Sequence, residues 1–421
     1  NHFGFLPGRG TSSELLQLLN VLEEIVEHNL EVDLFTQDVS GAFDSPERTP
    51  QWACWRRIGF PASLATYLTN LGALSKYQIN SPYGTRSSDM SEDDRDPELD
   101  DPFTPRRGGT QGDPLSTLGW VVFFDVLLTA LNAVQQEYPF YIRQAGSALL
   151  SQLPLCYADD LHAICSSPEA TARFNDVTSA FAAMFSIDFA EKKARAISTR
   201  ANPAPMLLHN AKWEEFTIPF KGPDCIIKSL GLEYSLSYRW DQQYKDLLVK
   251  FKQVALVLSK KQASTMAKSL LQNTSSTPKI LYTAQFSPFT DEQLDSISAV
   301  LMQPLRKAKA IGTRAAGKVL SNEILGGFSH DIGALVQKRK LALIDLAFNE
   351  GGATAAAMRG LMLRTMRRGM HDPTVTHGTH TAEKPISGKV RWDWWATSLI
   401  HRSLLTQDHL RYVGLPSDTP H

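Results

Sequence analysis

Two aspartates inside an apolar stretch place the strongest constraint on what this chain can fold into. The short apolar runs Leu153–Ala158 and Leu161–Cys165 are separated by nothing but Asp159 and Asp160. Apolar runs of this length on either side of a polar break predict a β-hairpin with both carboxylates at its tip.

Other segments supply partners for this hairpin. Glu14–His28 repeats apolar residues at helical spacing, and Glu31–Asp38 has the pattern of a strand that ends on a third carboxylate, Asp38. Pro114 follows Asp113 as the first residue of a helix should, before a long, nearly uncharged run that predicts a buried helix. Further predictions are helices starting near Pro61 and at Glu169–Phe185, strands at Ala194–Thr199 and Ile226–Tyr234, and helices from about Trp240 onward. The expected fold class is α+β.

Composition excludes several classes of protein. The chain has 421 residues, of which 43% are hydrophobic, as in ordinary globular proteins. The longest uncharged apolar candidate, Leu118–Leu131, is interrupted by Asp125 and is shorter than the roughly 18 residues of a membrane span, so no such span is predicted. The four cysteines show no CxxC spacing, which favours free thiols in a reducing compartment over a structural zinc site. Since the first residue is Asn, we expect the chain to begin inside a larger protein.

The net charge of −1 hides a strong asymmetry along the chain. Residues 86–103 carry eight Asp or Glu against two Arg, whereas residues 304–421 carry seventeen Lys or Arg against nine Asp or Glu. The second region contains Arg364, Arg367 and Arg368, and interleaves Lys389 and Arg391 with Trp392, Trp394 and Trp395. Such a pattern suits a surface that binds single-stranded nucleic acid, and it equally suits a tryptophan-rich core helix with solvated charges.

Asp38, Asp159 and Asp160 form the candidate catalytic group. Placed at the strand ends of one sheet, these carboxylates would repel one another unless a cation lay between them. Carboxylate oxygens are hard ligands that suit Mg²⁺ or Mn²⁺, and paired ions of this kind clamp a phosphoryl group during its transfer. A solvated turn is the commoner role of an Asp-Asp pair. Here the apolar strands on both sides favour a two-metal site.

At this point the chain resembles the reverse transcriptases, and among them those of non-LTR (LINE-type) retrotransposons. The matching segments are, in the family's order, Phe3–Thr11 (FGFLPGRGT), Asp38–Asp44 (DVSGAFD), Gly109–Ser116 (GTQGDPLS), Tyr157–Asp160 (YADD), Lys192–Arg195 (KKAR) and Ser229–Leu232 (SLGL). Pro278–Tyr282, Gln293–Ile297 and Leu325–Phe328 are similar to the thumb region of LINE-type enzymes. The resemblance covers about residues 1–350.

The resemblance implies a role for each matched residue. The metal ligands would be Asp38, Asp159, Asp160 and the Val39 carbonyl, and Lys193 would donate a proton to the leaving pyrophosphate. The nucleotide would be bound by Val39, Phe43, Gln111, Gly112 and Tyr157. The primer grip would be formed by Leu230 and Gly231. The Phe43 ring would exclude a sugar 2′-hydroxyl, although a core aromatic beside Trp52 and Trp55 has the same spacing. Lys193 equally suits a solvated surface position, and Gln111 and Gly112 a simple turn before the helix.

The resemblance also implies an architecture and a function. The fold would be a right-hand polymerase, with a fingers remnant over residues 1–30, a palm built on an antiparallel sheet over 31–234, a helical thumb over 235–330 and a basic, mostly helical extension over 331–421. The activity would be RNA-directed DNA synthesis, in which a primer 3′-hydroxyl is extended with two Mg²⁺ ions, or Mn²⁺ in their place. The partners would be template RNA, a DNA primer or target DNA and dNTPs, with no membrane. Localisation would be nuclear, with a cytoplasmic ribonucleoprotein stage.

Three departures from the family pattern leave alternatives open. The family has an earlier fingers segment upstream of Phe3, so we expect this sequence to be a fragment that lacks it. No endonuclease motif and no cysteine–histidine knuckle occur, so target cutting is expected from another region or protein. The alternatives are a catalytically idle, reverse-transcriptase-like RNA-binding protein and a group II intron type reverse transcriptase or maturase. Phe43 disfavours an RNA-templated RNA polymerase.

Overall fold

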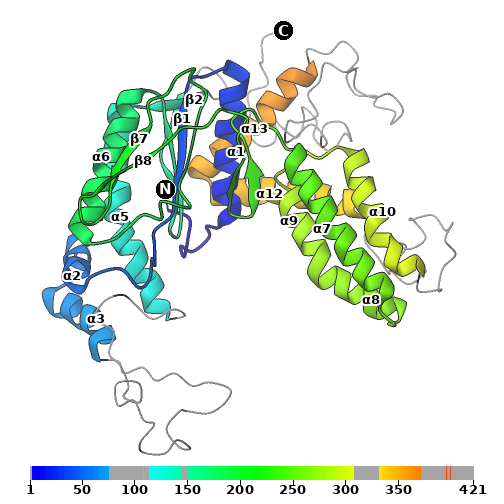
Figure 1. The fold of residues 1–421 in the computed structure, drawn as a ribbon, viewed down its shortest axis with the longest axis horizontal. Coiled ribbons are helices and arrows are strands. Elements are labelled where there is room, and N and C mark those ends of the chain that lie inside the picture. Colours follow the sequence, from blue (N-terminus) through cyan, green and yellow to red (C-terminus); the bar gives the residue numbers. More distant parts are fainter. Residues whose placement is uncertain are drawn as a thin grey trace, which may run out of the picture.

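The structure is a computed structural model that describes residues 2–74, 108, 113–143, 149–307 and 331–370, together with Trp395 and Leu399. It is a mixed helical and sheet protein in which helices enclose a small central sheet (Figure 1). The predicted α+β class is confirmed at this level. The acidic stretch 86–103 and most of the tail beyond residue 370 lie outside the described residues.

The central sheet has four antiparallel strands in the order β4-β5-β1-β6. Its strands are β1 (Asp33–Gln37), β4 (Leu155–Tyr157), β5 (Asp160–Cys165) and β6 (Arg195–Ser198). Strands β4 and β5 form the hairpin that the sequence predicts, with Tyr157 paired to Asp160 across a turn made by Ala158 and Asp159. The predicted strand that ends on Asp38 is β1, which lies at the centre of the sheet.

Both faces of this sheet are buried, because alternate residues of each strand point to opposite sides. Leu34 of β1 packs on the side of α1 (Thr11–His28), whereas its neighbour Phe35 packs with α5 (Pro114–Glu137) and α6 (Pro168–Phe185). The helix predicted from Pro114 begins there, and the Asp113 side chain caps it by accepting a hydrogen bond from the Leu115 amide at 2.9 Å.

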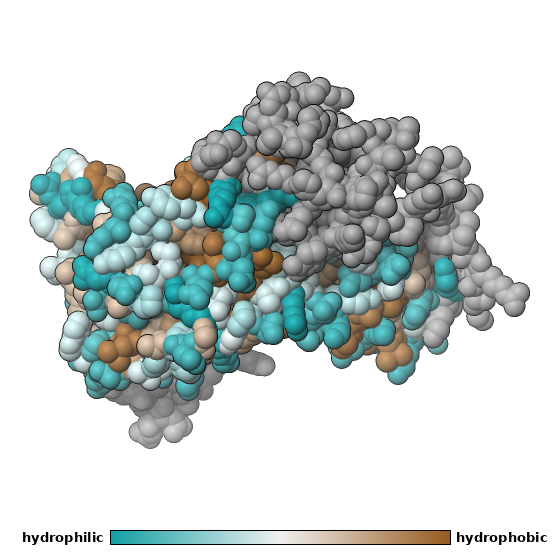
Figure 2. Space-filling view, turned by 90° about the horizontal axis from the view of Figure 1, so that it is seen from above, coloured by the Kyte–Doolittle hydropathy of each residue, from teal (hydrophilic) through white to brown (hydrophobic). Residues whose placement is uncertain are grey.

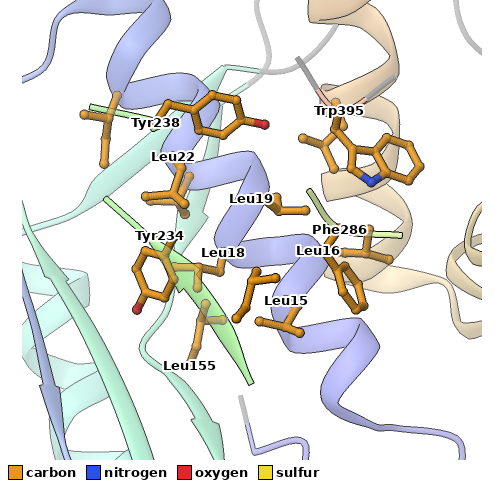
Figure 3. Packing of buried hydrophobic residues seen from close by; sticks show 14 of the residues in the cluster. Leu15, Leu16, Leu18, Leu19, Leu22, Leu155, Tyr234, Tyr238, Phe286 and Trp395 are labelled. Carbon is orange, nitrogen blue, oxygen red and sulfur yellow. The ribbon is translucent and has the colours of Figure 1, made fainter. Parts of the chain in front are cut away.

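Helix α1 is the centre of the larger core. Its leucines contact the sheet on one side, and on the other the helices α12 (Ile332–Glu350) and α13 (Gly352–Met370) (Figure 3). Trp395 and Leu399 are fully buried in the same cluster. Residues near both ends of the described chain therefore pack together around α1.

A helical bundle lies beyond α1 on the side away from α5 and α6 (Figure 1). Its members are α7 (Asp241–Lys260), α8 (Thr265–Leu271), a π-helical turn (Gln272–Ser276), α9 (Thr277–Ala284) and α10 (Asp291–Lys307). Its core also receives the first turns of α12, while later residues of α12 belong to the α1 cluster. Helix α12 thus joins the bundle to the body that contains the sheet.

Several short elements were not predicted. They are α2 (Arg48–Arg57) and the hairpins β2–β3 (Phe140–Arg143 and Leu149–Gln152) and β7–β8 (Met206–His209 and Glu215–Ile218). Strands of four residues carry too little alternation to stand out from a loop, and α2 buries only Cys54 and Trp55. Helix α3 (Ala62–Leu74) and the hairpin β9–β10 (Ile227–Ser229 and Leu232–Tyr234) occur where helix and strand were expected.

Helix α5 is longer than the apolar run within it. Among the helices that the structure describes, α5 is the one long and apolar enough to cross a membrane, and half of its most apolar stretch is buried inside the fold. Its charged residue Asp125 pairs with Arg57 of α2, with 2.6 Å between the Nη1 and Oδ2 atoms. The face in Figure 2 carries small hydrophobic areas among hydrophilic side chains.

Candidate active site

Strand pairing brings the three predicted carboxylates to one edge of the central sheet. Gln37, the last residue of β1, is paired with Leu161 of β5, so continuing the antiparallel register places Asp38 level with Asp160. Asp159 precedes Asp160 in the β4–β5 turn. All three side chains are only partly exposed.

The ionisation of these groups reflects their proximity. Burial, a hydrogen bond with Asp38 and the charges of Asp38 and Asp160 together raise the pKa of Asp159 to about 6, and burial contributes most. Burial also raises the pKa of Asp160, where the nearby His162 opposes the shift. Ionised together, the three carboxylates would destabilise one another, so this sheet edge favours a bound cation.

One cation of the chain already lies there. Lys193, in the loop before β6, has its Nζ 2.5 Å from Oδ2 of Asp38, and this contact raises the pKa of the lysine. The other carboxylate oxygen, Oδ1 of Asp38, is buried and has no hydrogen-bond partner among the described residues. An unpaired buried carboxylate oxygen is costly and indicates a position for a further donor or ligand.

The geometry falls short of a complete metal-binding set. In the part of the chain that the structure describes, no group of three His, Cys, Asp or Glu side chains is arranged to hold a metal ion. The oxygen donors present are of the type that Mg²⁺ prefers, and Asp38 offers a free oxygen. The residues therefore fit such an ion by chemistry, while their present arrangement has Lys193 against Asp38.

A cavity of about 300 Å³ opens beside these groups. Asp38, Asp160, His162 and three cationic residues, Lys193, Arg195 and Lys228, contribute to its lining. His162 is fully buried and its Nδ1 lies 3.0 Å from Oε1 of Glu14 on α1. A cavity lined by both carboxylates and cationic side chains matches a ligand that carries phosphates together with a metal ion. Arg195 belongs to the matched segment Lys192–Arg195 but was given no role in the site, and His162 and Lys228 were not predicted as members of it. The signal that the sequence offered for His162 and Lys228 was their place within predicted strands.

The predicted nucleotide-binding residues have different surroundings, and two of them lie outside the described residues. Val39 is buried and its backbone pairs with Phe189. Phe43 is half-buried against the core cluster that contains Trp55 and Trp120, with its ring centroid 6.1 Å from that of Phe5 and 6.0 Å from that of Trp120. Tyr157 ends β4 and packs against the α1 cluster. Gln111 and Gly112 lie outside the described residues.

The predicted primer-grip residues form the tight turn between β9 and β10. Leu230 and Gly231 have φ angles of 48° and 78°, and the Tyr282 hydroxyl of α9 donates a hydrogen bond of 2.7 Å to the Leu230 carbonyl. Lys228 and Ser229 of β9 line the cavity. The turn is therefore fixed between the candidate site and the helical bundle.

The basic C-terminal surface proposed from the sequence needs correction. Arg364 is buried on α13, where it hydrogen-bonds Asn20 and pairs with Glu24 at 2.7 Å and Glu27 at 3.2 Å. Trp395 is buried as well. Arg364 joins the core because α13 packs on α1. Trp395 is buried in the same cluster around α1, so the core interpretation of Trp395 is confirmed. Lys389, Arg391, Trp392 and Trp394 lie outside the described residues.

Comparisons with known proteins add a distant likeness of fold. No protein-family model matches the chain, and no curated protein matches it. Among solved structures, the chain is similar to telomerase from Candida albicans, in complex with the TWJ fragment of telomeric RNA, with 8% identity and a TM-score of 0.33. The alignment covers 82% of this chain and 53% of the telomerase chain, so the chain spans about half of that protein's length. A likeness of this size assigns no family.

Proposed function

We propose that the protein is an RNA-directed DNA polymerase of the LINE-type reverse-transcriptase kind, with a right-hand architecture. The observation that carries the proposal is the convergence of Asp38, Asp159, Asp160 and Lys193 at one edge of an antiparallel sheet beside a polar cavity. They come from three segments that lie far apart in the sequence, and each segment is a different ordered motif of the resemblance: Asp38–Asp44, Tyr157–Asp160 and Lys192–Arg195.

Asp38, Asp159, Asp160 and the Val39 carbonyl would hold two Mg²⁺ ions, with Mn²⁺ as a substitute. When bound, such ions lower the pKa of an attacking hydroxyl and stabilise charge on a transferring phosphoryl group. The unpartnered Oδ1 of Asp38 supports this assignment, and so does the raised pKa of Asp159, to which burial contributes most and the nearby Asp38 and Asp160 add. Without the ions, Lys193 neutralises Asp38.

Lys193 would hold a proton for the leaving pyrophosphate. Its side chain is two-thirds exposed, and the contact with Asp38 keeps it protonated by raising its pKa. Because the lysine side chain is flexible and lines the cavity, its ammonium group can leave Asp38 and contact an anionic ligand in the cavity. Phe43 would lie under the sugar and select deoxynucleotides, and Leu230 and Gly231 would support the primer.

Template RNA, a DNA primer or target DNA, and dNTPs are the partners that this activity requires. Arg195 and Lys228 in the cavity lining complement their phosphates. Target cleavage would come from another region or protein. A nuclear location, with a cytoplasmic ribonucleoprotein stage, follows from the same proposal.

Primer extension on an RNA template with dNTPs and Mg²⁺ tests the polymerase. The variant Asp159→Asn should reduce the rate by at least about a hundredfold, since it removes a carboxylate that is proposed to hold the metal ions. Asp176→Asn is the matched control, because Asp176 is a mostly exposed aspartate on α6. Extension that survives in the Asp159 variant would rule out the proposed site.

An RNA-binding protein without polymerase activity is the second candidate. It is favoured by the contact between Lys193 and Asp38 and by the lack, in the described ranges, of a three-residue metal-binding set. Tight RNA binding by the wild-type protein and the Asp159→Asn variant, with no extension by either, would select this function.

A further inference from the structure

The turn that carries the catalytic carboxylates is held in a costly conformation. Ala158 has a φ of 57°, in the left-handed region that side chains other than glycine rarely adopt. Its carbonyl accepts a hydrogen bond of 2.9 Å from Nε1 of Trp120 on α5. His2 Nε2 and Cys156 Sγ lie 3.3 Å and 3.4 Å from the same oxygen. Three donor groups therefore surround a single carbonyl.

The N-terminal segment closes the other side of this turn. The Phe3 amide donates to the Cys156 carbonyl at 2.7 Å, which continues the edge of the sheet beside β4. A Cβ atom placed on Gly4 would lie 2.5 Å from the Ala158 nitrogen, a distance that real Cβ atoms do not adopt. Glycine therefore permits the close approach that confines the turn.

The packing of Trp120 fixes the direction of its indole N–H. The side chain is 2% exposed, and its ring stacks on Phe124 with centroids 5.2 Å apart. It also contacts Phe43, the residue proposed to lie under the nucleotide sugar, with centroids 6.0 Å apart. A buried ring in fixed contacts cannot turn away, so the hydrogen bond to Ala158 is set by the packing of α5.

We propose that Trp120 is a positioning residue: its indole N–H fixes the Ala158 carbonyl and so sets the directions of the Asp159 and Asp160 carboxylates. The kinetic consequence of this inference rests on the proposed polymerase function, whereas the structural consequence at the turn does not. Trp120 touches none of the reacting groups and acts through the backbone of the hairpin.

The test compares Trp120→Phe with Trp240→Phe. Both changes take an indole from a buried position, but Nε1 of Trp240 has no hydrogen-bond partner among the described residues, so that variant controls for packing alone. Three quantities are measured in each protein. They are kcat and KM for dNTP in primer extension, the Kd for Mn²⁺ without nucleotide, and amide hydrogen exchange at residues 157–161.

We expect Trp120→Phe to lower kcat roughly threefold to tenfold, the range given by one hydrogen bond, with KM for dNTP unchanged. The Kd for Mn²⁺ should rise by a similar factor, and exchange at the turn should become faster. Trp240→Phe should leave all three at wild-type values. If the Trp120 variant matches the Trp240 variant throughout, the inference is wrong. If wild-type protein neither extends primers nor binds Mn²⁺, the proposed function fails, and the exchange rates alone decide whether Trp120 fixes the turn.

Discussion

Asp159 is the residue at which function and stability should oppose each other. Its pKa is raised to about 6 because its carboxyl is half-buried beside Asp38 and Asp160. Below about pH 4 the carboxyl is protonated in the folded and the unfolded chain alike, so it has no effect on the free energy of unfolding. Between pH 4 and 6 the unfolded chain ionises first, and stability falls as the pH rises. Above pH 6 the carboxyl is ionised in both states, and the full loss of stability caused by its raised pKa remains.

Asp159→Asn should therefore stabilise the protein relative to wild type at about pH 7.5 and not at about pH 4. Two pKa units correspond to roughly 3 kcal/mol, and the solvent around this half-exposed carboxyl reduces the expected gain to about 1 kcal/mol. Urea unfolding at the two pH values measures the difference. Asp176→Asn on the exposed face of α6 should change stability at neither pH. A gain that is equal at both pH values would contradict the origin assigned to this shift.

Arg364 shows how a basic residue loses its apparent role through packing. From the sequence it belongs to a cationic helix that could face nucleic acid. In the structure it neutralises the buried Glu24 and the partly exposed Glu27 of α1. A buried carboxylate without a partner costs several kcal/mol, so the arginine serves the core.

At the level of elements, the β9–β10 turn is the best-defined link between the candidate site and the bundle. Gly231 has a φ of 78°, and a Cβ atom placed on it would lie 3.3 Å from the Tyr282 ring. Leu230, which precedes it, also has a positive φ, so the turn is of the type that hairpins of two-residue connection prefer. The Tyr282 hydroxyl on α9 donates a hydrogen bond to the Leu230 carbonyl in this turn.

Gly231→Ala should destabilise the protein by about 1 to 2 kcal/mol, since alanine in the left-handed region is strained and the Tyr282 ring has little room to yield. The control is Gly222→Ala, at a glycine with no atom near its Cβ position and no left-handed φ. Urea unfolding measures both variants. Equal stability of the two variants would show that the turn relaxes freely.

At the scale of the whole molecule, Trp395 ties the body that contains the sheet to the helical bundle. Its amide donates to Oε1 of Glu23 on α1, and its indole N–H donates to the Gln285 carbonyl after α9 at 2.7 Å. The Trp395 carbonyl accepts a hydrogen bond of 2.9 Å from Nζ of Lys340 on α12. The Trp395 ring lies beside Phe286 (Figure 3). Burial raises the pKa of Glu23 to about 7 and lowers the pKa of Lys340 to about 7.

Trp395→Ala should lower the free energy of unfolding by about 3 to 5 kcal/mol, because it opens a large cavity at this junction and removes the ring that packs there. Trp213→Ala removes a tryptophan that is 56% exposed on the β7–β8 hairpin and should cost less than about 1 kcal/mol. Chemical denaturation compares the two. A small effect at Trp395 would mean that the two parts hold together without the tail.

The sequence predicted the parts of this protein that depend on local pattern. The hairpin at Asp159 and Asp160, the strand before Asp38 and the helix from Pro114 all follow from short-range periodicity and capping, and the structure contains each of them. The roles in catalysis, the metal ions and the domain boundaries stay predictions. Four-residue strands such as β7 were missed because they are stabilised by their partners more than by their own pattern.

What the sequence by itself determined is therefore the set of main elements and the three carboxylates at strand ends, since side-chain alternation and turn chemistry act over a few residues. Tertiary structure alone decided that Lys193 meets Asp38, that Trp120 bonds to Ala158, and that Trp395 joins the core. Each of these contacts joins residues distant in the chain, and sheet register and helix packing decide which distant residues meet.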